Sequence, residues 1–291
     1  MSMSANIYPI KLNKDYYVVT ANDLIKGRQK MSLREAQILY IAMSQVVKDD
    51  KDFKTYNIPV SSLADFMNIN TSSLYRDLEH ICTDLLKRVV KIQLKDSHNP
   101  QEKKWKAFQW ISYAAYENGR LTIKLNDELK PFLIDLVSHY SQILLGTLCS
   151  FKSYYSARLY QLIVCEQGEN PYNSKEEWEF SCEYIREFFQ LDKTEYPRAY
   201  DLINKILKPA LTELRESDFC TIWDFENIYD SGRGKPIIGA KFKALSFKDK
   251  AEKDRFDKHW NLPFIKEKET KPRSTKTKKK QPDNDEDQIR L

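Results

Sequence analysis

The sequence predicts an α+β fold of two tandem winged-helix domains, each a helix-turn-helix followed by a β-hairpin wing, with a disordered, charged C-terminal tail. Three observations predict it: one order of helical and strand-like segments occurs twice, the apolar positions of the two halves align, and apolar residues almost vanish near the C-terminus. The 291 residues, 41% of them hydrophobic, are enough for two domains with buried cores. We expect an N-terminal segment at 1–14, a first domain at 15–140, a second domain at 141–250 and a flexible tail at 251–291.

The first half begins with the capping-box pattern of Ser32 and Glu35, which predicts a helix over 36–47. Asn118-Gly119 is a typical two-residue hairpin turn. The other expected segments are a strand at 55–60, a short helix at 61–67, a long helix capped by Thr71 or Ser72 that ends near Arg88, and strands at 89–94, 105–116 and 121–125.

The second half repeats this order. A helix starts at Ser150 or Ser153, and a long helix has Pro197 at its first position, where proline is well tolerated. Pro209 lies inside that long helix and is expected to kink it, because proline lacks a backbone donor. The other expected segments are a strand at 178–180, a short helix at 183–189, and strands at 220–229 and 236–247 joined by the loop 231–235.

The apolar positions indicate that the halves correspond. An offset of 122 residues matches one set, Leu63, Phe66, Met67 and Ile69, with Ile185, Phe188, Phe189 and Leu191. An offset of 125 matches the long helices, Leu78, Ile81, Cys82, Leu85 and Leu86 with Ile203, Ile206, Leu207, Ala210 and Leu211. This order of elements is that of a winged helix, a helix-turn-helix followed by a β-hairpin. The second helix of the helix-turn-helix commonly enters a DNA major groove. Two such units predict a protein that contacts two successive grooves of one duplex.

Polar residues of the second long helix fit a base-contacting surface. The outward set is Arg198, Asp201, Asn204, Lys205 and Lys208. Arginine and lysine can bond to guanine, and asparagine can bond to adenine. The loop between the last two strands adds Arg233 and Lys235, which suit phosphate or minor-groove contact. The structural alternative is a solvated helix face of mixed charge.

The first long helix carries Ser73, Arg76 and His80 outward, but neighbouring acids offset their charge. It contacts either DNA or another protein surface. Lys152 and Ser153 precede the helix that opens the second half, where a helix N-terminus favours phosphate. Simple capping of that helix is the alternative.

Several classes of protein are excluded or disfavoured. There is no G-x-x-x-x-G-K-[ST] motif, so an ATP-driven helicase or loader is not expected. The four histidines are dispersed, so no metal site, catalytic centre or cofactor is expected, which also counts against a nicking enzyme that uses Tyr154 or Tyr155 as nucleophile. Five dispersed cysteines indicate free thiols in a reducing cytoplasm, and no apolar run is long enough for a membrane span.

The body and the tail of the chain also differ in net charge. The net charge is +5, and the segment 266–291 holds nine basic and six acidic residues, which leaves the body near neutral. A DNA-binding surface must therefore be a local concentration of cations.

Three stretches resemble the plasmid replication initiator (Rep) proteins that bind iteron repeats. They are 18–39, with Val18-Val19-Thr20-Ala21-Asn22 and Met31-Ser32-Leu33-Arg34-Glu35; 150–160, with Ser150-Phe151-Lys152-Ser153-Tyr154-Tyr155; and 196–214, with Tyr196-Pro197-Arg198 and Leu207-Lys208-Pro209-Ala210. The likeness spans about residues 15–250.

The resemblance implies DNA binding without catalysis, with the second domain contacting the major groove of an iteron and the first serving dimerisation and auxiliary DNA contact. It implies a monomer at the origin, a homodimer that represses its own gene at an operator, and later recruitment of a host initiator and a replicative helicase. Tyr196 joins the DNA-contacting residues on this ground. A winged-helix transcription repressor without a replication role and a nicking enzyme remain as alternatives.

Overall fold

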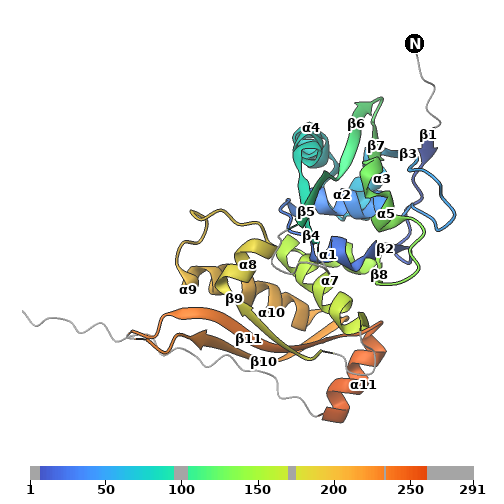
Figure 1. Cartoon of the computed structure of the whole chain (residues 1–291). Coiled ribbons are helices and arrows are strands. Elements are labelled where there is room, and N and C mark those ends of the chain that lie inside the picture. The colour runs from blue at the N-terminus through green and yellow to red at the C-terminus, as the bar shows by residue number, and fades with distance from the viewer. Residues whose placement is uncertain (1–6, 95–103, 170–174, 233, 261–291) are drawn as a thin grey trace, which may run out of the picture.

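The computed structural model describes residues 7–94, 104–169, 175–232 and 234–260. Two mixed domains lie one above the other in Figure 1, the first at the top and the second below. No helix within the described ranges is long and apolar enough to cross a membrane. The part of the predicted tail after residue 260 lies outside the described residues, as does Arg233 in the wing loop.

The first domain has the expected winged-helix order. The three helices of its winged-helix motif are α2 (Leu33–Met43), α3 (Val60–Phe66) and α4 (Thr71–Lys87). Its main sheet has the order β1–β3–β7–β6, formed by β1 (Ile7–Pro9), β3 (Thr55–Pro59), β6 (Ile111–Glu117) and β7 (Arg120–Leu125). The Asn118-Gly119 turn joins β6 to β7 with positive φ at both residues, as this hairpin type requires. The predicted capping box of Ser32 and Glu35 is present.

Two local expectations for this domain were wrong. The long helix is capped by Asn70, whose side chain accepts from the backbone N–H of Ser73, and not by Thr71 or Ser72. The strand expected at 105–116 is two strands, because Trp110 is buried and its backbone bonds to Arg88 and Asn126 instead of continuing one ladder. The first of these strands, β5 (Lys104–Gln109), pairs with β4 (Val89–Leu94) as a separate hairpin.

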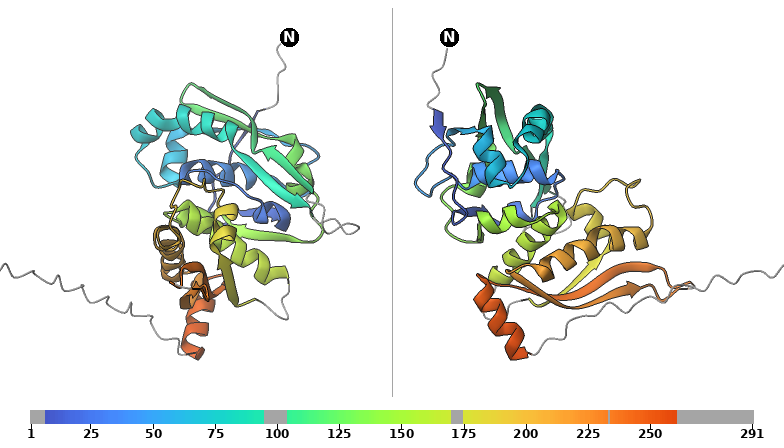
Figure 2. Two further views of the ribbon diagram at one scale, coloured as in Figure 1. Left: turned by 60° about the vertical axis from the view of Figure 1, so that its left-hand side comes forward. Right: turned by 180° about the vertical axis from the view of Figure 1, so that it is seen from behind.

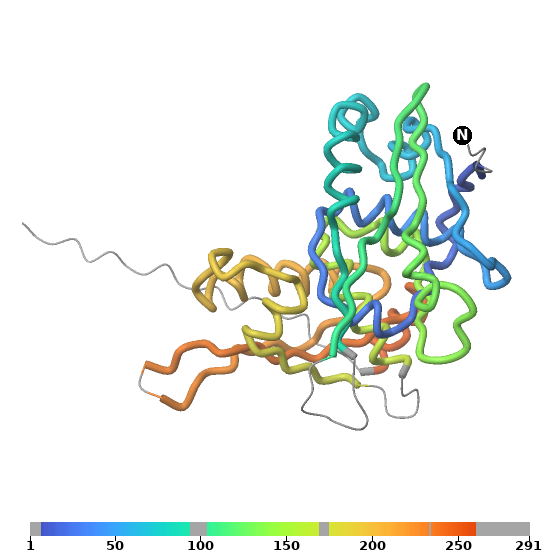
Figure 3. Tube along the Cα trace, turned by 45° about the horizontal axis from the view of Figure 1, so that its top comes forward, coloured from blue at the N-terminus to red at the C-terminus, as the bar shows by residue number. Residues whose placement is uncertain are grey.

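The second domain repeats the topology. It contains α7 (Tyr154–Glu169), β9 (Glu177–Ser181), α8 (Cys182–Phe188), a long segmented helix, and the hairpin of β10 (Cys220–Tyr229) and β11 (Ile237–Ser246). Its sheet order β10–β11–β9 matches the order β6–β7–β3 of the first domain. In the tube view of Figure 3, the β6–β7 and β10–β11 hairpins extend in different directions from the body.

The end of the second helix in each domain confirms the repeat at the level of the backbone. Asn68 has a φ of 51° and Gln190 has a φ of 50°, and the two positions differ by the same offset as the apolar residues before them. Just after them, Ile69 N–H bonds to the carbonyl of Ala64 and Leu191 N–H bonds to that of Arg186. Both helices therefore end in the same left-handed turn before the next helix begins.

The long helix of the second domain is neither continuous nor simply kinked. It consists of α9 (Ala199–Leu202), a π-helical turn (Ile203–Leu207) and α10 (Lys208–Glu216). Pro197 precedes Arg198, the N-cap residue, so the expectation that it occupies the first helical position was wrong. Pro209 cannot donate to the backbone, and just before it the Lys208 N–H bonds five residues back, to the carbonyl of Ile203.

The helix α7 joins the two domains. It packs against α1 (Asn22–Lys26) and β8 (Tyr140–Leu144) on one side and against α10 and β11 on the other. β8 pairs with β2 (Tyr17–Ala21), so the first domain continues past the expected boundary at residue 140, through β8 and α6 (Leu145–Ser150). A short 3-10 turn (Asp127–Leu129) and α5 (Lys130–Leu133) connect β7 to this region. The buried apolar residues form one cluster across both domains.

Polar contacts reinforce the junction. Arg158 of α7 is 1% exposed and donates to the carbonyls of Ile25 and Gly27 at 2.8 and 3.0 Å. Its guanidinium also lies 4.6 Å from the ring centroid of Phe188 in α8. Arg158 is thus a structural residue that ties the end of α1 to the second domain.

A flexible tail was expected from residue 251, but the first part of this segment is helical. Residues 250–260 form α11 (Lys250–Trp260), seen at the bottom of Figure 1. Phe256 contacts the rings of Trp223 and Phe247, and the ammonium of Lys253 donates to the carbonyls of Arg215 and Ser217 at the end of α10. A mostly charged helix is stable here because it packs on β10 and caps α10.

Candidate nucleic-acid interface

At the start of the long helix of the second domain, one nearly covered acid lies between two exposed cations. Asp201 Oδ2 lies 2.6 Å from Arg198 Nε, and Asp201 Oδ1 lies 3.3 Å from Lys205 Nζ. The side chains of Arg198 and Lys205 are 76% and 62% exposed, whereas that of Asp201 is 11% exposed. The two cations therefore face outward on either side of a nearly covered carboxylate.

The carboxylate remains ionised in this setting. Its bond to Arg198, and then that to Lys205, lowers the pKa of Asp201 below its ordinary value despite partial burial. The same bond raises the pKa of Arg198. The trio has a net charge of only +1, so the surface is better suited to oriented contacts than to strong unspecific attraction.

Asn204 and Lys208, the other two residues predicted to contact bases, have side chains that contact other parts of the protein. Asn204 Nδ2 donates to the carbonyl of Tyr200 at 2.7 Å, one turn back along the helix. The ammonium of Lys208 lies 5.3 Å from the ring centroid of Phe225, so it is directed toward the middle of β10. Arg198 and Lys205 are the two most accessible of the four predicted side chains.

Sequence reasoning missed Tyr200, which is 62% exposed on α9. It lies outside the apolar positions Leu202, Ile203 and Ile206, and that placement in a helical projection would have identified it. An exposed aromatic ring beside Arg198 offers apolar contact to a thymine methyl group.

The hairpin and the preceding turn hold the remaining predicted residues of the second domain. Lys235 is exposed with a φ of 41°, and its N–H bonds to the Gly232 carbonyl at 3.2 Å. Tyr196 is half-buried against the core, and its carbonyl accepts a hydrogen bond from Arg186 of α8. Tyr196 thus anchors the turn that leads into α9.

In the first domain, two of the three predicted residues of α4 lie beside acids of the same helix. Arg76 makes two hydrogen bonds to Asp77, at 2.7 and 3.1 Å. His80 Nε2 lies 3.3 Å from Asp84 Oδ2. Ser73 lies in the first turn, where its N–H is bonded to Asn70. The acids of this helix offset its cations, so it carries no net positive charge, as its sequence indicates.

The N-terminus of α7 is already occupied by an acid. Glu213 of α10 accepts from the backbone N–H of Lys152, and its other oxygen accepts from Ser156 Oγ at 2.5 Å. Ser153 Oγ accepts from the Tyr155 N–H at 3.2 Å, which is a capping contact. The exposed ammonium of Lys152 is what remains for a phosphate.

The adjacent tyrosines are not prepared for nucleophilic attack. Tyr154 is 6% exposed, and burial raises its pKa. Burial also raises the pKa of Tyr155 to about 12, and the ring of Tyr155 packs edge-on against Phe189 at 4.9 Å. No group of three or more His, Cys, Asp or Glu side chains suited to a metal ion occurs among the described residues.

The predicted DNA-contacting elements lie on one side of the molecule. In Figure 1, α4 is at the left of the first domain, and α9 with the far end of the β10–β11 hairpin is at the left of the second. Turning this side toward the viewer, as in the left view of Figure 2, brings α4 and the hairpin forward together.

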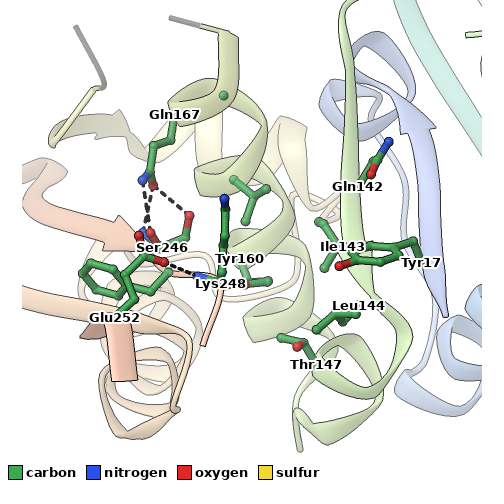
Figure 4. Close-up of a pocket in the computed structure, with 13 residues that line it drawn as sticks. Tyr17, Gln142, Ile143, Leu144, Thr147, Tyr160, Gln167, Ser246, Lys248 and Glu252 are labelled. Atoms are coloured by element: carbon green, nitrogen blue, oxygen red, sulfur yellow. Dashed lines mark hydrogen bonds between the residues drawn. The ribbon is translucent and has the colours of Figure 1, made fainter. Parts of the chain in front are cut away.

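Two clefts differ in the charge of their lining residues. The larger, of about 660 Å³, is lined by residues including Tyr17, Gln142, Gln167, Lys248 and Glu252 (Figure 4). Several of its polar groups are bonded to each other: the Gln167 amide bonds to the backbone of Ser246, and the N–H of Lys248 bonds to Glu252. The smaller cleft, of about 400 Å³, has three cations and no acid in its lining.

Comparison with known proteins identifies the family that has this architecture. A family model described as the WH1 part of initiator replication proteins matches residues 17–164, and one described as the WH2 part of initiator Rep proteins matches residues 181–244. A replication initiation protein of Escherichia coli is 24% identical over 201 residues, which are 68% of this chain and 61% of that protein. The chain thus spans about three fifths of the length of that relative.

A solved structure shares the fold. The crystal structure of the Pi initiator protein in complex with iteron DNA matches with a TM-score of 0.58 and 21% sequence identity, over 82% of this chain and 100% of that chain. The first family model includes β8, α6 and most of α7, in agreement with the packing of β8 on β2.

Proposed function

The chain belongs to the family of replication initiator proteins with two winged-helix domains, and on that premise we propose that it binds direct repeats at a plasmid origin and initiates replication there. The observation that carries the proposal is the Arg198–Asp201–Lys205 arrangement at the start of the second domain's long helix. It presents two oriented cations where a winged helix meets bases. The role needs no catalytic group, and a protein with this role works in the cytoplasm.

The second domain supplies most of the sequence-specific affinity in this proposal. Arg198, Lys205 and Tyr200 project from α9 and the π turn, and Lys235 projects from the hairpin loop. Bidentate contacts to guanine come from the helix, whereas the hairpin contacts the backbone. On α4, Arg76 and His80 each lie beside an acid, which fits a weaker, auxiliary contact.

We further propose two oligomeric states, a monomer on direct repeats and a homodimer on an operator that represses the gene. Large aromatic side chains are exposed on the β4–β5 hairpin and on β6: Trp105 at 56%, Tyr113 at 49% and Tyr116 at 55%. Trp105 is covered on one face by the ammonium of Lys91, 4.2 Å from a ring centroid. Exposed aromatic side chains of this kind on the first domain suit contact with a second copy of the chain. Recruitment of a host initiator and a replicative helicase would follow origin binding.

A plasmid test separates this function from that of a repressor without a replication role. A plasmid that carries the gene with its flanking DNA, and no other origin, is expected to replicate, and an early stop codon in the gene is expected to abolish replication. Supplying the protein from a second plasmid should restore it. Replication that continues without the protein would refute the initiator role, even if the protein still binds the flanking DNA.

A further inference from the structure

The smaller cleft, which is formed by first-domain residues and the segment before α7, combines three cations without a carboxylate partner. Lys14, Arg34 and Lys152 line it, together with Asn68 and an apolar floor that includes Phe66, Met67 and Phe151. Lys14 and Lys152 are exposed, and Arg34 is half-buried. Within the described part of the chain, none of the three side chains forms an ion pair, whereas Arg76, Lys205 and Arg198 each lie beside an acid.

A buried side chain orients the arginine. Gln37 is 2% exposed, and its Nε2 donates to the Cys149 carbonyl at 3.1 Å. This bond directs Gln37 Oε1 toward Arg34, which donates to it through NH1 at 2.9 Å. A guanidinium has five N–H donors, so the remaining donors of Arg34 stay available for an anion.

The electrostatics agree with an uncompensated cation. Partial burial lowers the pKa of Arg34, whereas bonds to acids raise the pKa values of Arg76, Arg88 and Arg198. An anion bound beside Arg34 would stabilise the charged guanidinium and so offset the effect of burial. Glu213 contacts the backbone of Lys152, but both of its oxygens are already bonded.

The position of the cleft identifies the anion. Asn68 belongs to the turn that leads into α4, and Lys152 is bonded through its backbone to Glu213 of α10. The cleft therefore borders both the turn that leads into α4 and the segment that leads from the first domain into α7. A duplex engaged by both helices carries its phosphate backbone past the segment between them.

We infer that Lys14, Arg34 and Lys152 form a third DNA contact, an anchor for backbone phosphate between the two winged helices. This inference rests on the proposed DNA binding and adds residues to it. The contact is to phosphate, so it adds affinity and fixes the relative position of the two domains on DNA without distinguishing sequences.

The test uses the full chain and two duplexes of equal length, one with a repeat from the protein's own origin and one of random sequence. Lys14→Ala/Lys152→Ala removes two exposed cations, and the triple variant also carries Arg34→Ala. Lys48→Ala/Lys248→Ala removes two lysines elsewhere and is the charge-matched control. Urea unfolding verifies that each variant is folded.

We expect the slope of log affinity against log salt to fall by about 0.9 for each phosphate that the variant no longer neutralises. The decrease in affinity should be equal on the two duplexes and absent from the control. A neutral methylphosphonate placed at successive positions between the two grooves should weaken the wild type at one or two positions, and at those positions it should not weaken the triple variant further.

The outcomes separate the inference from the function on which it rests. Slopes that match the control, or methylphosphonate effects equal in wild type and triple variant, would overturn the phosphate anchor while leaving origin binding intact. A wild type without preference for the repeat over random DNA would instead refute the proposed function.

Discussion

The carboxylate of Asp201 holds the guanidinium of Arg198 at 2.6 Å and, with its other oxygen, lies 3.3 Å from the ammonium of Lys205. One acid thus orients both of the most exposed cations of α9 and the π turn before any DNA is present. Orientation of this kind reduces the side-chain entropy that binding must otherwise remove. It also lowers the charge available for unspecific attraction, which favours discrimination between sequences.

Asp201→Asn tests this relationship, because it removes the charge and keeps the size of the side chain. We expect affinity for random DNA to rise and its salt dependence to steepen, since Arg198 and Lys205 are no longer neutralised. The ratio of origin-repeat affinity to random-DNA affinity should fall. Equilibrium binding to both duplexes at three salt concentrations measures this, and an unchanged ratio would mean that Asp201 has no part in selectivity.

Removing either cation should instead lower the affinity for DNA, and more on the origin repeat than on random DNA. Arg198→Ala or Lys205→Ala is expected to cost about 1–3 kcal/mol on the origin repeat if the side chain contacts a base. The decrease on random DNA should be smaller, and Lys48→Ala, in an exposed turn of the first domain, should change neither. Equal decreases on both duplexes would restrict these residues to phosphate contact.

The repeated architecture was predictable because burial dictates it. The residues that align between Leu63–Ile69 and Ile185–Leu191 are mostly buried, and the same turn geometry follows at Asn68 and Gln190. A buried apolar residue cannot be displaced without exposing its surface to water. The spacing of apolar residues in the sequence therefore predicts where the helices lie.

The π turn was not predicted from the sequence, although the spacing of the apolar residues around it indicates a wider turn. Leu202, Ile206, Ala210 and Leu214 are all buried and recur every four residues. Twelve positions of a regular helix advance about 1200°, roughly 120° beyond three turns. One wider turn at 203–207 absorbs much of that excess and keeps the four side chains on one face.

Other features depend on tertiary contacts and could not be predicted locally. The segment 250–260 looks like solvated chain until Phe256 is seen beside Trp223 and Phe247. The direction of Lys208 toward Phe225 likewise depends on how α10 packs against β10. Sequence pattern identifies which residues face outward, and packing decides what they touch.

The wing should contribute affinity without selectivity. Arg233→Ala together with Lys235→Ala is expected to weaken binding equally on origin and random duplexes, because a glycine-containing loop with cations suits backbone contact. The slope of log affinity against log salt should fall by about 0.9 for each phosphate left without its cation. A slope equal to that of the wild type would show that the wing does not touch the backbone.

The helix α11 should add stability to the second domain. Phe256→Ala is expected to lower the free energy of unfolding by about 1–2 kcal/mol, less than the effect of truncating a fully buried phenylalanine, because Phe256 is only partly buried. Urea denaturation measures the change. Arg255→Ala, an exposed neighbour on the same helix, is the control. Unfolding curves that coincide for both variants would mean that α11 packs too weakly to matter.

The exposed aromatics of the first domain should control the choice between two DNA-bound states. A direct repeat suits a monomer whose two domains follow one another along the duplex, whereas an inverted repeat requires a two-fold dimer. Trp105→Glu/Tyr113→Glu places charges on the proposed partner surface, so we expect it to bind direct repeats normally and the operator poorly. Val137→Glu alters a residue that is 90% exposed elsewhere and serves as control. Sedimentation velocity with each DNA gives the stoichiometry. Equal protein-to-site ratios for the wild type on both DNAs would contradict the switch, because the dimer would then have no separate role.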